Sequence, residues 1–424
     1  MAQLTPFQRY QTLKQGFTFS YRGYDLQGIL AGDLAQFAYG IKQEPLTWTF
    51  IKSKLFFSKN WEGLHSCLPK DAVVFTFDGY GKDYENLLQQ IMTEVPNALL
   101  FQPKHSVSKR FSIRHFILAL RPIFFNRNWK ILSFKERLQF YVILVHHLNT
   151  ILSLENSVKE VNTQKFVPFL SCLPVDSILC HFFRKHNVPS YGIQHGLHCA
   201  AQEYPGVIPY DVINLENLQA DYVLAWGTSI KKSLALAGHP SERFLLAGAP
   251  KYAHIREVKM QPFHRKSCIV ALARDTYWEG NLKLLRFIQD IEALGINVYV
   301  KFHPRSDQKL YAKALESYAY KHIDVNCSLV DSISLVKPGF AIVYNSTVYY
   351  EYYLQGIVTL RYAFALNDTP FGLEDTVESI AELEAFLSQW ETMEEQVRNQ
   401  KVAAMVEQFC ALGVNNYKSI LTAK

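Results

Sequence analysis

Apolar residues follow two alternating patterns along the first half of the chain. Short continuous runs lie at 72–77, 98–101, 166–170, 188–193, 221–226 and 244–247. Between the later runs, apolar residues recur at helical spacing in 176–186 and 229–237. A short apolar run bounded by turn residues is typical of a buried strand, and strands that alternate with helices favour a parallel sheet covered by helices. The pattern therefore predicts an α/β domain.

The same alternation starts again after a polar, irregular segment at 248–267, which we interpret as a linker. A helix is predicted near 282–294, and helical spacing continues from Ile380 onward. Further strands are predicted at 268–273, 296–300, 340–343 and 357–361. The simplest architecture is two Rossmann-like domains, 1–247 and 268–424, with the active site in the cleft between them.

Length and composition agree with a large enzyme from a reducing compartment. The chain has 424 residues, of which 49% are apolar, enough for two domains with proper cores. It contains no run of about 18 uncharged apolar residues, and its first residues lack a basic start followed by an apolar segment. Seven scattered cysteines without a Cys-x-x-Cys motif predict free thiols. We therefore expect a cytoplasmic protein without a membrane span.

Two short motifs in the second half follow predicted strands and combine groups that bind phosphate. One motif holds His303 and Arg305. The other consists of Asn345, Ser346 and Thr347 and leads into a helical pattern. Hydroxyl and backbone N–H groups at a helix start bind anions, and His or Arg adds charge-assisted hydrogen bonds. Because open α/β sheets bind ligands at the carboxyl ends of their strands, these residues predict a site for a nucleotide phosphate.

Two further residues belong to this predicted donor site. Arg274 follows the predicted strand at 268–273 and can reach a phosphate. Glu351 lies five residues after Ser346, about one and a half helical turns deeper. Alternatives stay open for both motifs, because residues 345–347 can form an ordinary N-cap and His303 can be a packed side chain without a ligand.

The first half offers two candidates for a general base. His195 follows a predicted strand and precedes Gly196, which permits a tight, exposed turn, and the unperturbed pKa of a histidine near neutrality suits proton transfer. Asp78 also closes a predicted strand, and Gly79 and Gly81 beside it indicate a sharply bent backbone. It can act as the base, orient the histidine or bind acceptor hydroxyls. The alternatives are a histidine bonded to a loop carbonyl and an ordinary Asp-Gly turn.

Five motifs occur in a fixed order at predicted strand ends: Gln194-His195-Gly196, Ala225-Trp226-Gly227, Ala247-Gly248-Ala249-Pro250, Phe302-His303-Pro304 and Asn345-Ser346-Thr347. This set resembles bacterial surface-polysaccharide glycosyltransferases with two Rossmann-like domains, the GT-B fold, over roughly residues 165–380. Capsule polysialyltransferases carry two acidic residues before the glycine of the first motif. Teichoic-acid glycerophosphotransferases carry Trp-His-Gly there. Both keep a His-Pro motif and a cluster of hydroxyl residues.

The segment 345–351 also resembles the Asp-Ser-Gly-Gly-x-x-Glu turn of nucleotide-sugar 2-epimerases. That resemblance implies that Ser346 and the neighbouring amides hold phosphate, and that Glu351 accepts hydrogen bonds from ribose hydroxyls. Thr347 and Val348 stand where the epimerases have two glycines. They leave less room against the phosphates, which argues against an epimerase.

Residues 104–137 contain nine basic side chains and one acidic side chain, with aromatic residues among them. Such a mixture suits an anionic surface, either lipid headgroups or a polyanionic acceptor. No nucleic-acid fold signature accompanies it, so nucleic acid is not an expected partner. The alternative is a solvated helical hairpin whose aromatic residues are core.

Together these features predict a glycosyltransferase that passes a sugar from a nucleotide-sugar, CMP- or UDP-linked, to a glycan or glycolipid acceptor of a bacterial capsule or lipopolysaccharide. His195 would be the base, and the protein would work peripherally on the inner face of the cell membrane. No metal is expected, because amides, hydroxyls and His303 can stabilise the leaving phosphate and the chain lacks Asp-x-Asp. The alternatives are a CDP-glycerol-type polyol-phosphate transferase, an epimerase-like isomerase and an inactive adaptor that binds an anionic polymer.

Overall fold

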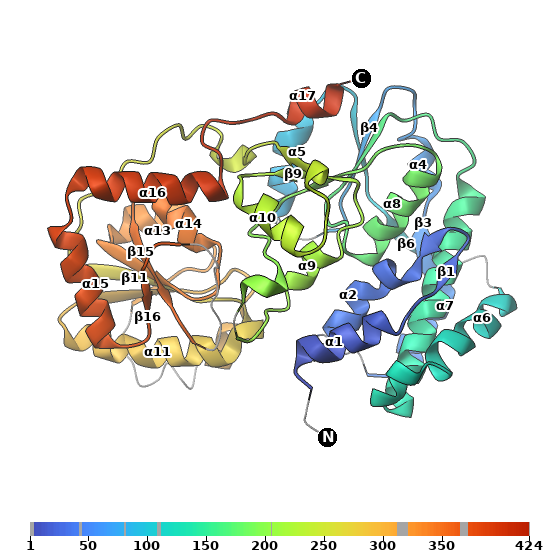
Figure 1. Cartoon of the computed structure of the whole chain (residues 1–424), viewed down its shortest axis with the longest axis horizontal. Coiled ribbons are helices and arrows are strands. Elements are labelled where there is room, and N and C mark those ends of the chain that lie inside the picture. The colour runs from blue at the N-terminus through green and yellow to red at the C-terminus, as the bar shows by residue number, and fades with distance from the viewer. Residues whose placement is uncertain are drawn as a thin grey trace.

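The computed structural model of the protein describes residues 4–41, 45–79, 82–107, 112–204, 206–311, 321–364 and 372–423. Its elements form two halves that lie side by side in Figure 1, the C-terminal half at the left and the N-terminal half at the right. Each half is built around a parallel sheet whose strands lie where the apolar runs predict them.

The sheet of the N-terminal half consists of β4 (Val73–Thr76), β5 (Ala98–Phe101), β7 (Lys165–Pro168), β8 (Tyr191–Ile193), β9 (Tyr222–Ala225) and β10 (Phe244–Leu246). Two three-stranded parts, β5-β4-β7 and β8-β9-β10, are joined by a parallel bridge between Phe166 and Ser190. All these pairings are parallel. The carboxyl ends therefore share one edge, where the chain leaves β4 toward Asp78 and β8 toward His195.

Helices cover this sheet and extend it with a second layer. Those that follow the strands are α5 (Lys82–Glu94), α8 (Pro174–Lys185), α9 (Val212–Glu216) and α10 (Ser229–Leu236). The second layer comes from α1 (Pro6–Gln15), α2 (Leu26–Ala38), α3 (Trp48–Phe56), α4 (Glu62–His65), α6 (Ile113–Phe124) and α7 (Phe134–Ser157). Short pieces complete it: β1 (Ser20–Tyr21) with β2 (Tyr24–Asp25), β3 (Phe57–Asn60) with β6 (Lys104–Val107), and the 3-10 helix η1 (Arg127–Ile131).

Local sequence signals fix the ends of the long helices in this layer. Helix α7 begins with a capping box, in which the Ser133 hydroxyl accepts from the Glu136 amide and the Glu136 carboxylate accepts from the Ser133 amide. Thr5 and Gln8 form the same arrangement at the start of α1. The apolar faces of α1, α2, α7 and α8 then pack in a second core, which also includes Val74 of β4 and Phe166 of β7.

The described strands of the C-terminal half form one parallel sheet in the order β13-β12-β11-β14-β15-β16. Its strands are β11 (Ser267–Ala271), β12 (Asn297–Lys301), β13 (Lys321–Ile323), β14 (Phe340–Val343), β15 (Val358–Tyr362) and β16 (Thr376–Val377). Its helices are α11 (Trp278–Ala293), α13 (Leu329–Val336), α14 (Val348–Leu354), α15 (Ile380–Thr392) and α16 (Glu395–Phe409). The strand order reverses between β11 and β14, the point where ligands bind in open α/β sheets.

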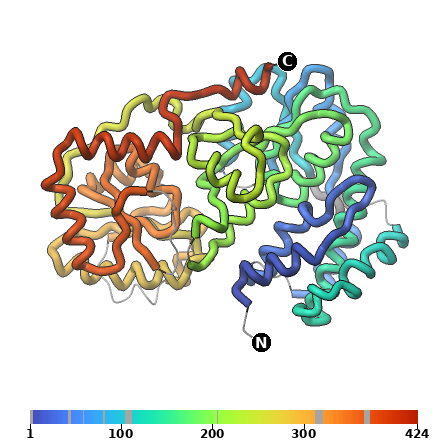
Figure 2. Tube along the Cα trace, in the orientation of Figure 1, coloured from blue at the N-terminus to red at the C-terminus, as the bar shows by residue number. Residues whose placement is uncertain are grey.

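The last residues of the chain return to the N-terminal half. Figure 2 shows the tail crossing from the half that carries α15 and α16 to the other half. The amide of Ala411 donates to the Trp226 carbonyl at 2.9 Å. Lys165 Nζ donates to the carbonyls of Ile420, in α17 (Tyr417–Thr422), and Ala423. The boundaries at 247 and 268 stay a prediction, and any division has to place α17 with the N-terminal sheet.

Two glycines of the ordered motif set make this return possible. A Cβ atom on Gly227 would lie 2.4 Å from the carbonyl oxygen of Gln408, and one on Gly248 would lie 1.9 Å from that of Val414. Gly248 also has a φ of +85°, which glycine adopts without strain. These two motif glycines therefore admit the backbone of the C-terminal segment.

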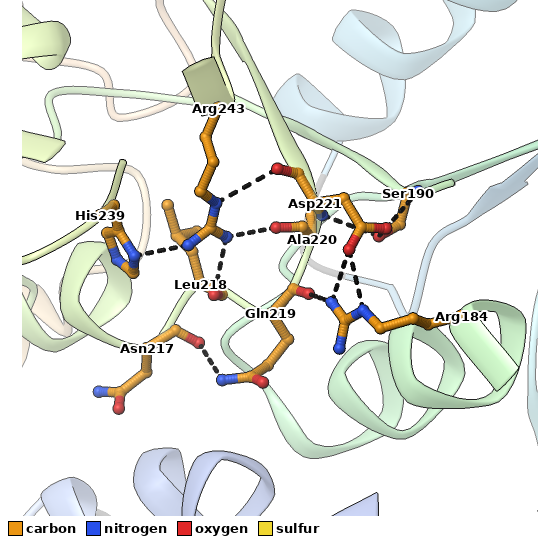
Figure 3. A network of polar contacts seen from close by, with 9 residues as sticks. All are labelled: Arg184, Ser190, Asn217, Leu218, Gln219, Ala220, Asp221, His239 and Arg243. Atoms are coloured by element: carbon orange, nitrogen blue, oxygen red, sulfur yellow. Dashed lines mark hydrogen bonds and ion pairs between the residues drawn. The ribbon is translucent and has the colours of Figure 1, made fainter. Parts of the chain in front are cut away.

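A polar network fixes the opposite edge of the N-terminal sheet, where β8 and β9 begin (Figure 3). The Arg243 guanidinium donates to the carbonyls of Leu218 and Asp221 at 3.0 and 3.3 Å. The Asp221 carboxylate in turn accepts from Arg184 at 2.9 Å and from the Ser190 hydroxyl at 2.7 Å. Because the network lies away from the carboxyl ends of the strands, it holds the scaffold and takes no part in the candidate site.

The strand order confirms the predicted fold class, α/β with two Rossmann-like domains. Within the described ranges, no helix has both the length and the apolar character to cross a membrane. The linker segment after Gly248 contains the 3-10 helix η4 (Pro250–Tyr252) and then packs on the C-terminal half, where Gln261 donates to the Gly356 carbonyl at 2.8 Å.

Candidate functional site

The carboxyl edges of the two sheets contact each other through side chains on their loops. Arg274, after β11, forms an ion pair with Asp211 of the N-terminal half. The Arg305 guanidinium, after β12, lies 5.9 Å from the ring centre of Tyr84 in α5. The strand ends that carry the predicted donor and acceptor groups are therefore brought together.

The imidazole of His303 is held in one tautomer by its own turn. Its Nδ1 accepts a hydrogen bond from the Arg305 amide at 3.1 Å, so the proton of the neutral ring sits on Nε2. Burial is the largest cause that lowers the His303 pKa to about 4, and the positive charges of Arg274 and Arg305 lower it further. At neutral pH the half-buried ring is thus an uncharged Nε2–H donor, and a phosphate bound against it would raise the pKa again.

The loops that follow β11 and β12 are tied to each other. The Asp275 carboxylate accepts from the Asp307 amide at 2.8 Å and from the Tyr311 hydroxyl at 2.9 Å. Asn281 in α11 donates to the same hydroxyl at 2.8 Å and accepts from the Ala273 amide at 2.9 Å. These bonds fix the turn around Arg274 relative to the turn around His303, without a contribution from either predicted ligand.

The turn of residues 345–347 sits at the start of α14. Asn345 has a φ of +41°, a left-handed conformation that asparagine tolerates better than most residues. The Ser346 hydroxyl accepts from the Val348 amide at 3.4 Å, whereas the Thr347 side chain makes no capping bond to the helix. All three side chains are half-buried. Ser346 thus makes only a long capping hydrogen bond and Thr347 makes none, so an ordinary N-cap explains these side chains poorly. Their role in phosphate binding stays a prediction.

Glu351 and Arg274 both have partners in this structure. The Glu351 carboxylate accepts from Lys251 Nζ at 3.0 Å. Arg274 pairs with Asp211, whose carboxylate also accepts from the Tyr277 hydroxyl at 3.4 Å. Their predicted contacts with ribose and phosphate would therefore replace ion pairs between protein groups.

His195 lies on the loop after β8, facing the donor motif. A Cβ atom added to Gly196 would lie 3.9 Å from Thr347 Cγ2 across the two halves. His195 Nδ1 lies 3.3 Å from the Ile193 carbonyl oxygen, which can only accept. The neutral ring therefore carries its proton on Nδ1 and a lone pair on Nε2, as a general base requires. Burial is the main cause that lowers the His195 pKa to about 4.

Gln194 and Tyr84 hold this loop in place. Gln194 Oε1 accepts from the Trp226 amide at 2.7 Å, and its Nε2 donates to the Gly196 carbonyl at 2.8 Å. The ring centre of Tyr84 lies 5.6 Å from that of His195 in an edge-to-face arrangement. The alternative for His195, a bond to a loop carbonyl, is met in altered form: the carbonyl belongs to Ile193, the last residue of β8, and the contact sets the tautomer that a base needs.

Asp78 is held in an ion pair, and its possible roles as base, as orienting group for His195 or as a ligand of acceptor hydroxyls stay predictions. Both of its carboxylate oxygens accept from Lys59 Nζ at 2.9 Å, and Lys59 is buried. Asp176, 1% exposed, accepts from the Thr76 hydroxyl and the Leu170 amide, and burial raises its pKa to about 6. Asp78 is therefore part of an ion pair beside a second carboxyl group. Gly81, which we took as part of the same turn, lies outside the described residues.

Sequence reasoning missed Lys59, Asp211 and Tyr84, and it ranks His198 as a less attractive candidate than His195. Lys59 lies in β3, whose pairing with β6 is antiparallel, and the other three lie on helices or loops without a motif of their own. Their only sequence signal is a polar or aromatic residue near a predicted strand end, which many unrelated positions share. What makes them notable is their place in the fold.

The region 104–137 contains β6, α6, η1 and the start of α7. Lys109 and Arg110 lie outside the described residues. Helix α6 buries His115, Ala119 and Ile123 against the protein, and Trp129 is also buried. The predicted hairpin with core aromatic residues is thus correct for part of the region. Other large apolar side chains face solvent, at exposed fractions of 73% for Ile113, 66% for Ile117, 80% for Phe125 and 67% for Phe134.

No family model matches the chain, and no curated protein matches it. Among solved structures it is similar to the wall teichoic acid polymerase TagF, at 15% identity and a TM-score of 0.39 over 99% of this chain and 96% of that one. It is also similar to UDP-GlcNAc 2-epimerase from Neisseria meningitidis bound to UDP-GlcNAc, at 13% identity and a TM-score of 0.44 over 83% of this chain and 98% of that one. The lipopolysaccharide outer core galactosyltransferase WaaB is similar at 11% identity and a TM-score of 0.43 over 82% of this chain and 97% of that one. Likeness this weak says nothing about activity.

Proposed function

We propose that the protein is a metal-independent glycosyltransferase that uses a nucleotide-sugar, CMP- or UDP-linked, and extends a bacterial surface glycan. The observation that carries the proposal is the meeting of two kinds of group at the contact between the halves. A neutral His195 with its lone pair on Nε2 lies on a loop whose Gly196 approaches Thr347, in the turn that holds the hydroxyl groups. On this proposal a proton acceptor would stand opposite an anion site, as transfer from a phosphate leaving group requires.

The C-terminal half would bind the donor. His303 Nε2–H, Arg305 and the hydroxyls of Ser346 and Thr347 supply hydrogen-bond donors for phosphate oxygens. Glu351 and Arg274 would add contacts to ribose and phosphate after release from Lys251 and Asp211.

In the transfer step, the acceptor hydroxyl oxygen would form a bond to the anomeric carbon while the bond from that carbon to the phosphate oxygen breaks. The hydroxyl proton moves to His195 Nε2. The bonding electrons leave with the nucleotide, whose added charge is stabilised by the donors on the C-terminal half. The same groups would serve a polyol-phosphate transferase, in which the hydroxyl attacks a phosphorus atom, so the donor decides between these two functions.

A panel of nucleotides in a thermal-shift assay tests the proposal. CMP, UDP, GDP, CDP-glycerol and inorganic phosphate would each be added to the full chain. A ligand that binds only the folded state raises the Tm, by an amount that grows with the logarithm of its concentration above the Kd. We expect CMP or UDP to raise it, and His303→Ala to remove the effect. A Tm that rises with none of them would contradict the donor site, and a selective effect of CDP-glycerol would favour the polyol-phosphate transferase.

We also propose that residues 104–137 hold the enzyme on the anionic inner face of the cell membrane, near a lipid-linked acceptor. Two observations support this. Ile113, Ile117 and Leu120 recur at helical spacing on the solvent side of α6. Exposed basic residues flank this apolar face: Arg114, Arg121, Arg127 and Lys130. An apolar face bordered by cations is the pattern of an interfacial helix.

Cosedimentation with phosphatidylglycerol–phosphatidylcholine vesicles at low and high salt tests this second proposal. We expect binding that salt weakens, and a loss in Ile117→Gln/Phe125→Gln. Leu335→Gln is the matched control, because Leu335 is 72% exposed on α13 of the other half. Equal binding of both variants would return the region to a purely structural role.

A further inference from the structure

A small cavity lies behind His195 in the N-terminal half. Its walls come from the segment after β7, from β8 and from the loop that carries His195. Its volume of about 10 Å³, on the scale of positions open to the centre of a water molecule, is roughly what one ordered water needs. Most of its lining is apolar, and the polar side chains among the lining residues are Ser171, Cys172, His195, His198 and Asn214.

Two of these polar groups are buried without a hydrogen-bond partner in the described part of the chain. His198 is 6% exposed, and neither of its ring nitrogens has a partner. Ser171 is 2% exposed, and its hydroxyl also has none. Cys172 and Asn214 bond each other at 3.2 Å. A buried polar group without a partner is disfavoured, so these two side chains would be stabilised by a further hydrogen-bonding molecule in this cavity.

The lining selects an uncharged occupant. Burial lowers the His198 pKa to about 3, so this ring is neutral at neutral pH and offers one donor and one acceptor. The Ser171 hydroxyl also offers both. The remaining walls are apolar, among them Phe169, Ile193 and Val223. An anion or a cation would be poorly stabilised here, whereas a water molecule is uncharged and offers both donors and acceptors to these side chains.

The cavity borders the candidate base. The ring centre of His198 lies 5.0 Å from that of His195, in an edge-to-face arrangement. Other groups that face or bias His195 are Tyr84 from α5, Asp211 from the start of α9 and Arg274 from the C-terminal half. Of these, Asp211 favours and Arg274 opposes a positive charge on the ring. A water dipole in the cavity would be a neutral neighbour able to stabilise the imidazolium.

We propose that Ser171 and His198 bind an ordered water in this cavity, and that the hydrated pair positions His195 and stabilises the proton it takes up. This inference rests on the proposed role of His195 as the base. Ser171 and His198 are thus positioning residues that act through the water. Their loss should lower the proton affinity of His195 and make it a weaker base.

A crystal structure of the full chain tests the first part without reference to activity. We expect a water within hydrogen-bonding distance of the Ser171 hydroxyl and of one His198 nitrogen. An empty cavity, or a direct bond from a protein group to His198, would overturn the proposal.

Titration of the full chain with ¹³Cε1-labelled histidine tests the second part, also without a substrate. We expect Ser171→Ala and His198→Phe to lower the proton affinity of His195 by roughly three- to tenfold, since each variant removes one of the two groups that would hold the water dipole beside the charged ring. Ser332→Ala is the matched control, because it removes a buried hydroxyl of the C-terminal half. An unchanged His195 titration in both test variants would overturn the proposal even where the water is present.

The pH profile of transfer separates this inference from the proposed function. The base must be neutral to work, so the rate falls as the pH drops below its pKa. We expect the acidic limb of Ser171→Ala to move to lower pH while the plateau falls. A wild-type chain without any transfer activity would refute the proposed function, and the water site would still be decided by the crystal structure and the titration. A lower plateau with an unmoved limb would mean that Ser171 is merely structural.

Discussion

The two halves are both built on a parallel sheet, yet the carboxyl edges of the two sheets differ in the kinds of side-chain groups that they carry. At the C-terminal edge, backbone amides orient the side chains, as the Arg305 amide orients His303, and hydrogen-bond donors prevail. At the N-terminal edge, buried titratable groups prevail: Lys59 paired with Asp78, the carboxyl group of Asp176, and the rings of His195 and His198. The comparison teaches that the scaffold sets where side chains meet, whereas the strand-end residues set which chemical groups each edge presents.

Removal of the His195 side chain should have the largest effect on the transfer rate. It should leave nucleotide binding at the other edge unchanged, and so distinguish the roles of the two edges. We expect His195→Ala to lower transfer by roughly 10²- to 10⁴-fold, the usual contribution of a general base. Nucleotide affinity should be preserved, because the predicted phosphate ligands lie on the other half. Turnover would be measured at saturating acceptor, with calorimetry for nucleotide binding. Asp78→Asn is the control, and near-normal turnover in His195→Ala with a dead Asp78→Asn would move the base to Asp78.

Gly248→Ala tests whether a motif glycine serves chemistry or packing. The new Cβ would lie 1.9 Å from the Val414 carbonyl, and the φ of +85° strains any other residue. We expect a loss of roughly 2–4 kcal/mol in the free energy of unfolding, from strain and a displaced C-terminal segment. Denaturant unfolding is the measurement. Gly238→Ala is the matched control, since its φ is +80° and its Cβ would meet nothing within 4 Å. Equal losses in the two variants would show that only backbone strain matters.

Substitutions in the donor motif should weaken nucleotide binding while the fold stays intact. Hydrogen bonds to charged groups contribute about 1.5–3 kcal/mol, so we expect His303→Ala and Ser346→Ala each to raise the nucleotide Kd by roughly 10- to 150-fold. Calorimetry with the preferred nucleotide is the measurement. An unchanged Kd in both variants would remove the phosphate site from this edge.

The pH dependence of nucleotide affinity gives a second test of His303 as a phosphate ligand. His303 is neutral above about pH 4 in the free protein, and a bound phosphate should raise its pKa. Affinity should therefore increase as the pH falls from neutrality through the raised pKa toward about 4, and His303→Ala should lose this increase.

The smallest expected effect concerns Asp211, which couples the two edges. Asp211→Asn should release Arg274 for the nucleotide phosphate and lower the Kd by roughly two- to tenfold. The effect is modest because both side chains keep exposed fractions near 40% (41% and 38%), where water screens an ion pair. Weaker binding in Asp211→Asn would show instead that the ion pair holds Arg274 in its binding orientation.

Much of the fold was predictable from short-range patterns. The runs 72–77 and 340–343 became β4 and β14 because an apolar run between turn residues has to be buried, and a parallel sheet is the structure that buries it from both sides. The turn after such a strand was equally predictable, and so His195, His303 and Ser346 lie at strand ends. Their chemical roles stay predictions. Helix α6 illustrates the limit, because only packing shows that Ile123 is buried while Ile117 is exposed.

The sequence by itself determined the strands, their ends and the residue types placed there, because burial and turn formation depend on neighbours along the chain. The tertiary structure alone decided the pairings: Arg274 with Asp211 63 residues earlier, Lys59 with Asp78, and the tail of the chain against Gly248. It also created the cavity beside His198. Ion pairs and buried polar groups depend on distance in space and on exclusion of water, and neither quantity is written in the order of residues.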